Sequence, residues 1–274
     1  GVAVTTPALN LNGTAALTAT NNNVAVQSNG AANALTVTMG NGSAINAAAA
    51  GGDITFNNTT SGAITVNNAG LGTINANDTV VLNGNAGAVS VNAAQVNGTV
   101  TGSGAGFTVI TAAGSLAANT VASSGAVTLT ASAGALTAAN VSTSSGNISL
   151  SAGSGSLLAT NIANSSGAGT TTLSVNAGGN LTANNVAGNG AVTLTNLSGV
   201  GFGNISLTGN VSSVNAAITM TSGTAATATT TIGAAVSASG TTVAITTPTL
   251  SLGAGASVNA TSGGMDINSN AATG

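Results

Sequence analysis

A 21-residue unit repeats without a gap in the middle of the chain. Residues 125–145 read GAVTLTASAGALTAANVSTSS, and residues 146–166 read GNISLSAGSGSLLATNIANSS. When the two segments are aligned, Val127 falls on Ile148 and the later apolar residues match in the same way. A repeat this short cannot bury its apolar face alone and must stack on its neighbours. The repeat therefore predicts a fold that is built from stacked turns.

The first apolar position of this repeat can be followed along the whole chain. A second apolar residue lies two positions after each of these sites, so inward and outward residues alternate within each segment. Such alternation is typical of a β-strand, and the Thr, Val, Asn and Gly content disfavours helix. The thirteen sites recur at similar but unequal spacings and are Val2, Val24, Ile45, Ile64, Val89, Phe107, Val127, Ile148, Leu173, Val192, Ile218, Val243 and Met265.

A second strand is predicted about half a repeat after the first. Its motif, G-x-L-x-A-x-[NT]-[VI], begins at Gly114, Gly134, Gly155 and Gly179. Glycine and asparagine between the strands provide the positive-φ corners of a chain that turns tightly. We expect an all-β protein, namely a parallel β-solenoid (β-helix) of about 13 coils with about 22 residues per coil.

The chain shows no internal boundary of composition. Pro7 and Pro248 are isolated and no charged segment separates two regions, so we expect a single continuous β-solenoid over residues 1–274. Residues 1–10 and 260–274 carry the same alternation as the middle of the chain. Uncapped strand edges pair readily with other strands. These two ends are therefore predicted to join subunits end to end.

Two ladders of like side chains are expected inside or at the corners of the stack. Asn140, Asn161 and Asn185 each precede an apolar residue of the second strand, with Thr120 in the same place one repeat earlier. Stacked amides in register can form hydrogen bonds from turn to turn, so these residues predict an amide ladder. One column of the hydrophobic core is assigned to Val127, Ile148, Leu173 and Val192.

The residue between the two apolar sites of the first strand points outward and carries a hydroxyl in eight successive repeats. One interpretation is purely structural, because Thr favours strands and stacked like side chains stabilise a sheet. The others are lateral packing against a second filament and a regular hydroxyl lattice that binds ice or polysaccharide. The predicted outward ladder is Thr65, Ser90, Thr108, Thr128, Ser149, Ser174, Thr193 and Thr219.

The amino-acid composition excludes most kinds of catalytic and metal-binding site. The 274 residues contain no Lys, Arg, His or Cys, and the acids are Asp53, Asp78 and Asp266. Nothing can neutralise phosphates, paired acid and base groups are missing, and zinc and calcium lack their usual ligands. No apolar run reaches the length of a membrane span. We expect no enzyme activity, no cofactor, no metal, no nucleic-acid partner and no membrane span.

The repeats resemble a known family. The segments GNISLSAGSGSLL at residues 146–158 and GGNLTANNVAGNGAVTLTN at residues 178–196 resemble the repeat regions of filamentous haemagglutinin-like exoproteins and related bacterial surface adhesins. The similarity covers roughly residues 52–223. It implies a β-solenoid filament that Gram-negative bacteria secrete or display at the cell surface, with a role in adhesion and matrix formation.

Together these observations predict a structural role. We expect the subunit of an extracellular bacterial filament, in a matrix, a sheath or an adhesive fibre, that assembles as a homopolymer by end-to-end stacking. The alternative is an ice- or polysaccharide-binding module that uses the outward Thr/Ser ladder, with a glycan or another surface as partner. Both place the protein outside the cell or on the bacterial cell surface.

Overall fold

The computed structural model describes residues 1–28, 34–67, 72–198 and 203–271. In these ranges the chain forms 29 strands and no helix, and every strand pairing recorded is parallel. The prediction of a parallel β-solenoid is confirmed. The chain divides into two compact units, Gly1–Ala133 and Gly134–Gly274. Each unit is described by itself, and the single continuous domain over residues 1–274 stays a prediction.

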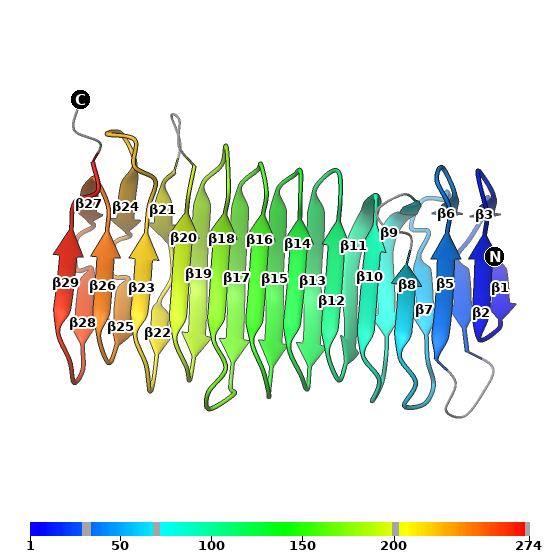
Figure 1. Cartoon of the computed structure of the whole chain (residues 1–274), viewed down its shortest axis with the longest axis horizontal. Helices are drawn as coiled ribbons and strands as arrows, with labels where there is room; N and C mark the ends of the chain where they lie inside the picture. Colours follow the sequence, from blue (N-terminus) through cyan, green and yellow to red (C-terminus); the bar gives the residue numbers. More distant parts are fainter. Residues whose placement is uncertain (29–33, 68–71, 199–202, 272–274) are drawn as a thin grey trace. The chain divides into compact units, whose positions relative to one another are not determined.

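Each turn of unit 1 contributes strands to three faces, and each strand pairs with the same face of the next turn (Figure 1). The first face consists of β2 (Ala8–Leu11), β5 (Leu35–Met39), β8 (Ile64–Asn67), β10 (Val89–Ala93), β12 (Phe107–Thr111) and β14 (Val127–Ala131). The second face begins with β3 (Ala16–Ala19) and β6 (Ala44–Ala47), and the third with β1 (Val2–Thr5), β4 (Val24–Gln27) and β7 (Ile54–Asn57). The longer strands β9 (Thr73–Asn83), β11 (Gln95–Gly104) and β13 (Leu116–Ser123) follow, and β9 pairs with both β6 and β7.

Unit 2, taken by itself, also has three faces, and it contains six turns (Figure 1). Its first face consists of β16 (Ile148–Ala152), β18 (Thr171–Val175), β20 (Val192–Asn196), β23 (Ile218–Thr221), β26 (Val243–Thr246) and β29 (Met265–Asn268). The strands β15 (Leu136–Thr143), β17 (Leu157–Asn164) and β19 (Leu181–Gly188) span the second and third faces. The second face then continues with β21 (Ile205–Leu207), β24 (Thr229–Ile232) and β27 (Thr249–Leu252), and the third with β22 (Val211–Ser213), β25 (Ser237–Gly240) and β28 (Ser257–Ala260).

The turns differ in length more than the sequence suggested. On the first face Leu9 pairs with Val37 and Val37 with Val66, and each of these turns is longer than any spacing in the predicted apolar column. Val91 pairs with Val109, which makes that turn shorter than the average repeat. The corners differ in the number of residues they contain, and the strands therefore stay in register. The total is about twelve turns, six in each unit, close to the expected 13 coils.

The long first turns correct the start of the predicted apolar column. Val2 does pair with Val24, but both lie on the third face, and Val24 then pairs with Ile54. Ile45 lies on the second face. The predicted column was wrong here because it assumed about 22 residues per turn. Where the real turns are longer, a step of that length ends on a different face of the same turn. From Ile64 onward the predicted residues do lie on the first face.

The core of each unit is a set of stacked apolar columns. Strands such as β14 and β16 alternate buried and half-buried residues, and the two described phenylalanines, Phe56 and Phe107, are fully buried. Several of the buried polar side chains lie at corners and bind the backbone there, and Asn196 is an example. Asn196 Nδ2 donates to the carbonyl oxygens of Gly179 and Asn204, both at 3.0 Å, and Asn196 Oδ1 accepts from Ser198 N at 3.1 Å. Hydrogen bonds of this kind satisfy backbone groups that a tight corner would leave unpaired.

The predicted core column falls on both units, with Val127 in unit 1 and its other three members in unit 2. Val127, Ile148, Leu173 and Val192 are all fully buried. The register nevertheless pairs Ile148 with Thr171 and Thr171 with Val192, whereas Leu173 pairs with Leu150. The prediction slipped by two positions at Leu173 because Thr171 occupies an inward position. Threonine has the β-branched shape of valine, so it fits a core column although its hydroxyl suggests a surface residue.

No helix in the described part of the chain has the length and apolar character that crossing a membrane requires.

Candidate functional site

Two parallel rows of hydroxyl groups cover the first face of unit 2. The pairings of β16, β18, β20, β23 and β26 place the rows in register from turn to turn. We call the following nine residues the hydroxyl face: Ser149, Thr172, Thr193 and Thr219 in one row, and Ser151, Ser174, Thr195, Thr221 and Thr246 in the other. Beyond Thr219 the first row continues with Ala244 and Asp266.

Strand geometry sets the spacing of this array. Neighbouring strands lie about 4.8 Å apart, and residues two apart along a strand are separated by roughly 6.6 Å. All nine side chains are half-buried, because each is flanked by its neighbours in the row. Each hydroxyl can donate one hydrogen bond and accept others. The array is therefore a periodic, uncharged surface of donors and acceptors.

The predicted outward ladder falls on two units, with four members in each, and the register displaces one of the members in unit 2. In unit 1 Thr65, Ser90, Thr108 and Thr128 pair successively in one row. In unit 2 Thr172 stands between Ser149 and Thr193, and Ser174 belongs to the neighbouring row. The prediction of Ser174 was wrong because the alignment was displaced by two residues in this strand, and the same displacement misplaced Leu173.

Two residues that continue the predicted outward ladder were missed by the sequence reasoning. Thr36 precedes Thr65 in unit 1, and Thr172 stands beside Ser149 in unit 2. The alternation of TTLSV at residues 171–175 against ISLSA at residues 148–152 could have revealed Thr172. Nothing local could have revealed Thr36, because the turn that separates it from Thr65 is unusually long.

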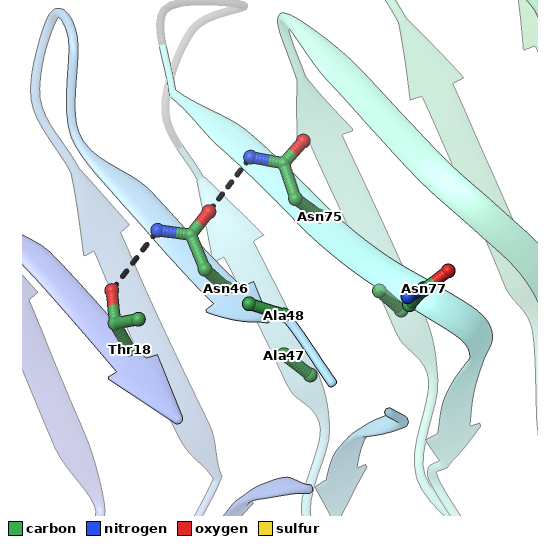
Figure 2. Close-up of a pocket in the computed structure, with 7 residues that line it drawn as sticks. Thr18, Asn46, Ala47, Ala48, Asn75 and Asn77 are labelled. Carbon is green, nitrogen blue, oxygen red and sulfur yellow. Dashed lines mark hydrogen bonds between the residues drawn. The ribbon is translucent and has the colours of Figure 1, made fainter. Parts of the chain in front are cut away.

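Unit 1 carries an amide ladder beside a shallow hollow, which Figure 2 shows. Asn46 Nδ2 donates to Thr18 Oγ1 at 3.1 Å, Asn75 Nδ2 to Asn46 Oδ1 at 2.8 Å, and Asn97 Nδ2 to Asn75 Oδ1 at 2.6 Å. The hollow has a volume of about 340 Å³ and is lined by Thr18, Asn46, Ala47, Ala48, Asn75, Ala76 and Asn77. It offers amide groups and small apolar side chains, without any charge.

A second amide ladder lies at a corner of unit 2, as the sequence predicted. Asn161 Nδ2 donates to Asn140 Oδ1 at 3.0 Å, and Asn185 Nδ2 donates to Asn161 Oδ1 at 3.2 Å. Asn161 and Asn185 both have a φ of 54°, a left-handed conformation that asparagine tolerates better than most residues. These asparagines therefore stabilise the corner in two ways, through the backbone and through the stacked amides.

Asp53 and Asp78 take part in hydrogen bonds between neighbouring turns of unit 1. Asp53 Oδ2 accepts from Asn23 Nδ2 at 3.3 Å, and Asp53 Oδ1 accepts from Thr79 N at 3.2 Å. The backbone N of Asp78 donates to the carbonyl oxygen of Gly52 at 3.1 Å, so these two acids lie on neighbouring turns. Across the described ranges, no three His, Cys, Asp or Glu side chains gather as a metal site would require.

The last turn of unit 2 leaves its core residues exposed. Leu252, Met265 and Ile267 are 53%, 46% and 49% exposed. Their partners on the preceding turn, Ile232, Val243 and Ile245, are at most 1% exposed. At the first turn of unit 1, Val2, Val4, Leu9 and Leu17 are half-buried. Of the predicted joining ends, residues 1–10 and 260–271 are described, and residues 272–274 lie outside the described ranges.

Comparison with protein-family models, with curated proteins and with solved structures gives no match for this chain.

Proposed function

We propose that the protein is the structural subunit of an extracellular bacterial filament, in a matrix, a sheath or an adhesive fibre. In this proposal the last turn of one subunit stacks on the first turn of the next. The observation that carries it is the exposure of Leu252, Met265 and Ile267, which point along core columns that are buried one turn earlier.

The energetics of the last turn favour another turn on top of it. Covering a half-exposed large apolar side chain stabilises the stack by about 1 kcal/mol. Within the described ranges, β27, β28 and β29 pair with the preceding turn and no strand pairing is recorded on their other edge. Such edges are usually blocked by charges or prolines. Here Asp266 on β29 is the one charged residue among these three strands.

The first turn of a second copy has strands on the faces that would continue the strands of this last turn. β1 belongs to the third face, like β28, and β2 to the first face, like β29. If β2 continues β29 in register, Leu9 covers Ile267 and Asn10 lies beside Asn268. Neither strand carries a like charge that would repel the other, since Asp266 meets Ala8 in this register. The core columns then run from one subunit into the next.

A cysteine pair tests the joint and its register together. The chain has no cysteine of its own. Cα atoms on adjacent paired strands lie about 4.8 Å apart, which suits a disulfide. Under oxidation N10C/N268C should yield a reducible ladder of covalent multimers in denaturing gels. The matched pair N10C/S174C, with one cysteine in the middle of unit 2, should not.

A single substitution in the last turn tests whether apolar cover drives assembly. We expect the native chain to form filaments that electron microscopy and sedimentation detect, and Ile267→Asp to stay monomeric. Asn268→Asp places the same charge on the outward side of the same strand and should reduce assembly only at low salt. A native chain that remains monomeric at high concentration, or an Ile267→Asp variant that assembles normally, contradicts the proposal.

The location outside the cell belongs to the same proposal. The resemblance to bacterial surface exoproteins supports it. So does the complete lack of Lys and Arg, which leaves trypsin-like proteases no cleavage site. Antibody labelling of intact cells of the source bacterium should detect the protein at the surface or in the matrix. Labelling that requires permeabilised cells would place it inside and remove this part of the proposal.

A second function is favoured by the hydroxyl face. Nine hydroxyls in two registered rows form a regular lattice, and unit 2 maintains it over five strands. We propose, as the alternative, that this face binds ice or an uncharged polysaccharide. Thermal hysteresis measures the first and co-sedimentation with insoluble glycans the second. Thr193→Tyr with Thr195→Tyr should abolish either signal, whereas Thr182→Tyr on β19 should not. Equal signals for the two variants would refute the assignment of the face.

A further inference from the structure

We propose that Asn12 and Asn41 are sites of spontaneous deamidation, which changes the charge of the first two turns as the protein ages. The backbone N of the following glycine attacks Asn Cγ, the C–N bond of the amide breaks, and ammonia leaves. The five-membered succinimide that results is opened by water at either carbonyl, which gives aspartate or isoaspartate. This inference does not depend on the proposed assembly.

Glycine after asparagine is the sequence in which this attack meets least steric hindrance. The chain contains six such pairs, beginning at Asn12, Asn29, Asn41, Asn83, Asn97 and Asn189. Five lie in the described ranges, and Asn29 with Gly30 lies outside them. The structure separates these five pairs by the freedom of the asparagine amide and of the attacking glycine nitrogen.

Asn12 and Asn41 are the two in which no hydrogen bond to a described residue holds the asparagine amide or the glycine nitrogen. Both side chains are exposed, and neither makes a hydrogen bond to a described residue. Each pair lies in a tight corner closed by one backbone hydrogen bond, from Ala15 N to the Asn12 oxygen at 3.2 Å and from Ser43 N to the Gly40 oxygen at 3.1 Å. The backbone nitrogens of Gly13 and Gly42 take no part in these bonds.

The other three pairs are each restrained by a different contact. The nitrogen of Gly84, after Asn83, donates to the carbonyl oxygen of Ser103 at 2.8 Å. Asn97 Nδ2 is held by Asn75 Oδ1 in the ladder of unit 1. Asn189 Nδ2 donates to the carbonyl oxygen of Ser165 at 2.8 Å, and Gly190 is buried. Deamidation at these sites requires local opening first.

The two free sites are stacked on one another. Gly40 N donates to the carbonyl oxygen of Leu11 at 2.8 Å, so the corner that holds Asn41 lies on the corner that holds Asn12. Two new carboxylates would then repel each other across neighbouring turns, in a chain that has only three acids. Isoaspartate also adds a backbone carbon to a tight corner. We expect the first two turns to loosen as a result.

The test is incubation of the folded chain in mildly alkaline buffer at growth temperature, followed by mass-spectrometric mapping of the six sites. A non-specific protease such as elastase provides the peptides, and isoaspartyl methyltransferase reports isoaspartate. Asn12 and Asn41 should convert at least about tenfold faster than Asn83, Asn97 and Asn189, because the latter react only after opening. Asn29 is measured but is not part of this comparison.

Two variants and one unfolded control complete the design. N12Q/N41Q should lose both fast sites and retain the slow ones, and Asn189→Gln should leave the fast sites unchanged. In denaturant the five sites should convert at similar rates, which shows that the fold causes the difference. Equal rates at all five sites in the folded chain, or faster conversion at Asn83, Asn97 or Asn189, would overturn the inference.

Discussion

Thr171 pairs with Val192 in the core of unit 2, and its Oγ1 is buried without a hydrogen-bond partner among the described residues. On folding, the hydroxyl of Thr171 therefore gives up its hydrogen bonds to water and gains none from these residues. A buried hydroxyl that lacks a partner costs about 1–3 kcal/mol. Threonine tolerates the position because its shape matches valine.

Thr171→Val should raise the free energy of unfolding by about 1–2 kcal/mol, since the unpaired hydroxyl is replaced by a methyl group of similar shape. Denaturant-induced unfolding measures the change. Thr172→Val is the matched control, because Thr172 is half-buried on the outward side of the same strand. It should change stability by less than about 0.5 kcal/mol. A destabilised Thr171→Val would show that the hydroxyl has a partner in solution.

Replacement of the corner amide at Asn196 should destabilise unit 2. Asn196→Ala leaves the carbonyls of Gly179 and Asn204 and the N–H of Ser198 without their side-chain partner. The expected loss is on the order of 3 kcal/mol, seen in the thermal or denaturant midpoint. Asn176→Ala changes an exposed asparagine nearby and should be almost neutral. Equal effects of the two would mean that water replaces these hydrogen bonds.

The amide ladder of unit 2 separates backbone from side-chain effects. At Asn161 the φ of 54° is strained for alanine and free for glycine. Asn161→Ala should therefore cost about 1–2 kcal/mol, and Asn161→Gly should cost only the small loss of the exposed amide contacts. Unfolding in urea measures both. If Gly and Ala were equally destabilising, the stacked amides rather than the left-handed backbone would hold this corner.

Gly125 lies at a corner of unit 1 where two neighbouring turns are in close contact. A Cβ on Gly125 would overlap the carbonyl oxygen of Ala105 on the neighbouring turn. Gly125→Ala should therefore push two turns apart and destabilise the protein by about 1–3 kcal/mol. In Gly167→Ala the new Cβ meets nothing within 4 Å, so stability should be unchanged or slightly higher. Circular dichroism on heating compares the two variants.

The repeat at residues 125–166 shows how much of the register can be read locally. Leu136 pairs with Leu157 and Val141 with Ile162, as the gap-free alignment predicts. The ladder of Asn140, Asn161 and Asn185 also lies where the spacing placed it. These predictions succeed because consecutive turns of equal length transfer sequence spacing directly into spatial neighbours.

The first turns of unit 1 show where this reasoning fails. Alternation with period two is the same on every face, so the pattern around Ile45 does not reveal that it lies on the second face beside Leu17 and Ile74. Corners vary in length without changing the strands that they join. Thr36 and Thr65 are therefore neighbours in one row although the chain between them is longer than an average repeat.

The amino-acid sequence by itself determined that this chain forms stacked parallel β-strands with alternating apolar side chains and no charged chemistry, because alternation and repetition are local properties. Only the tertiary structure decided that each turn has three faces, that Thr172 rather than Ser174 completes a hydroxyl row, and that Ile45 lies on the second face. These features depend on which strands share hydrogen bonds across turns. The stacking of whole turns determines which strands pair. The lengths of distant corners affect this stacking as much as the residues of the strands do.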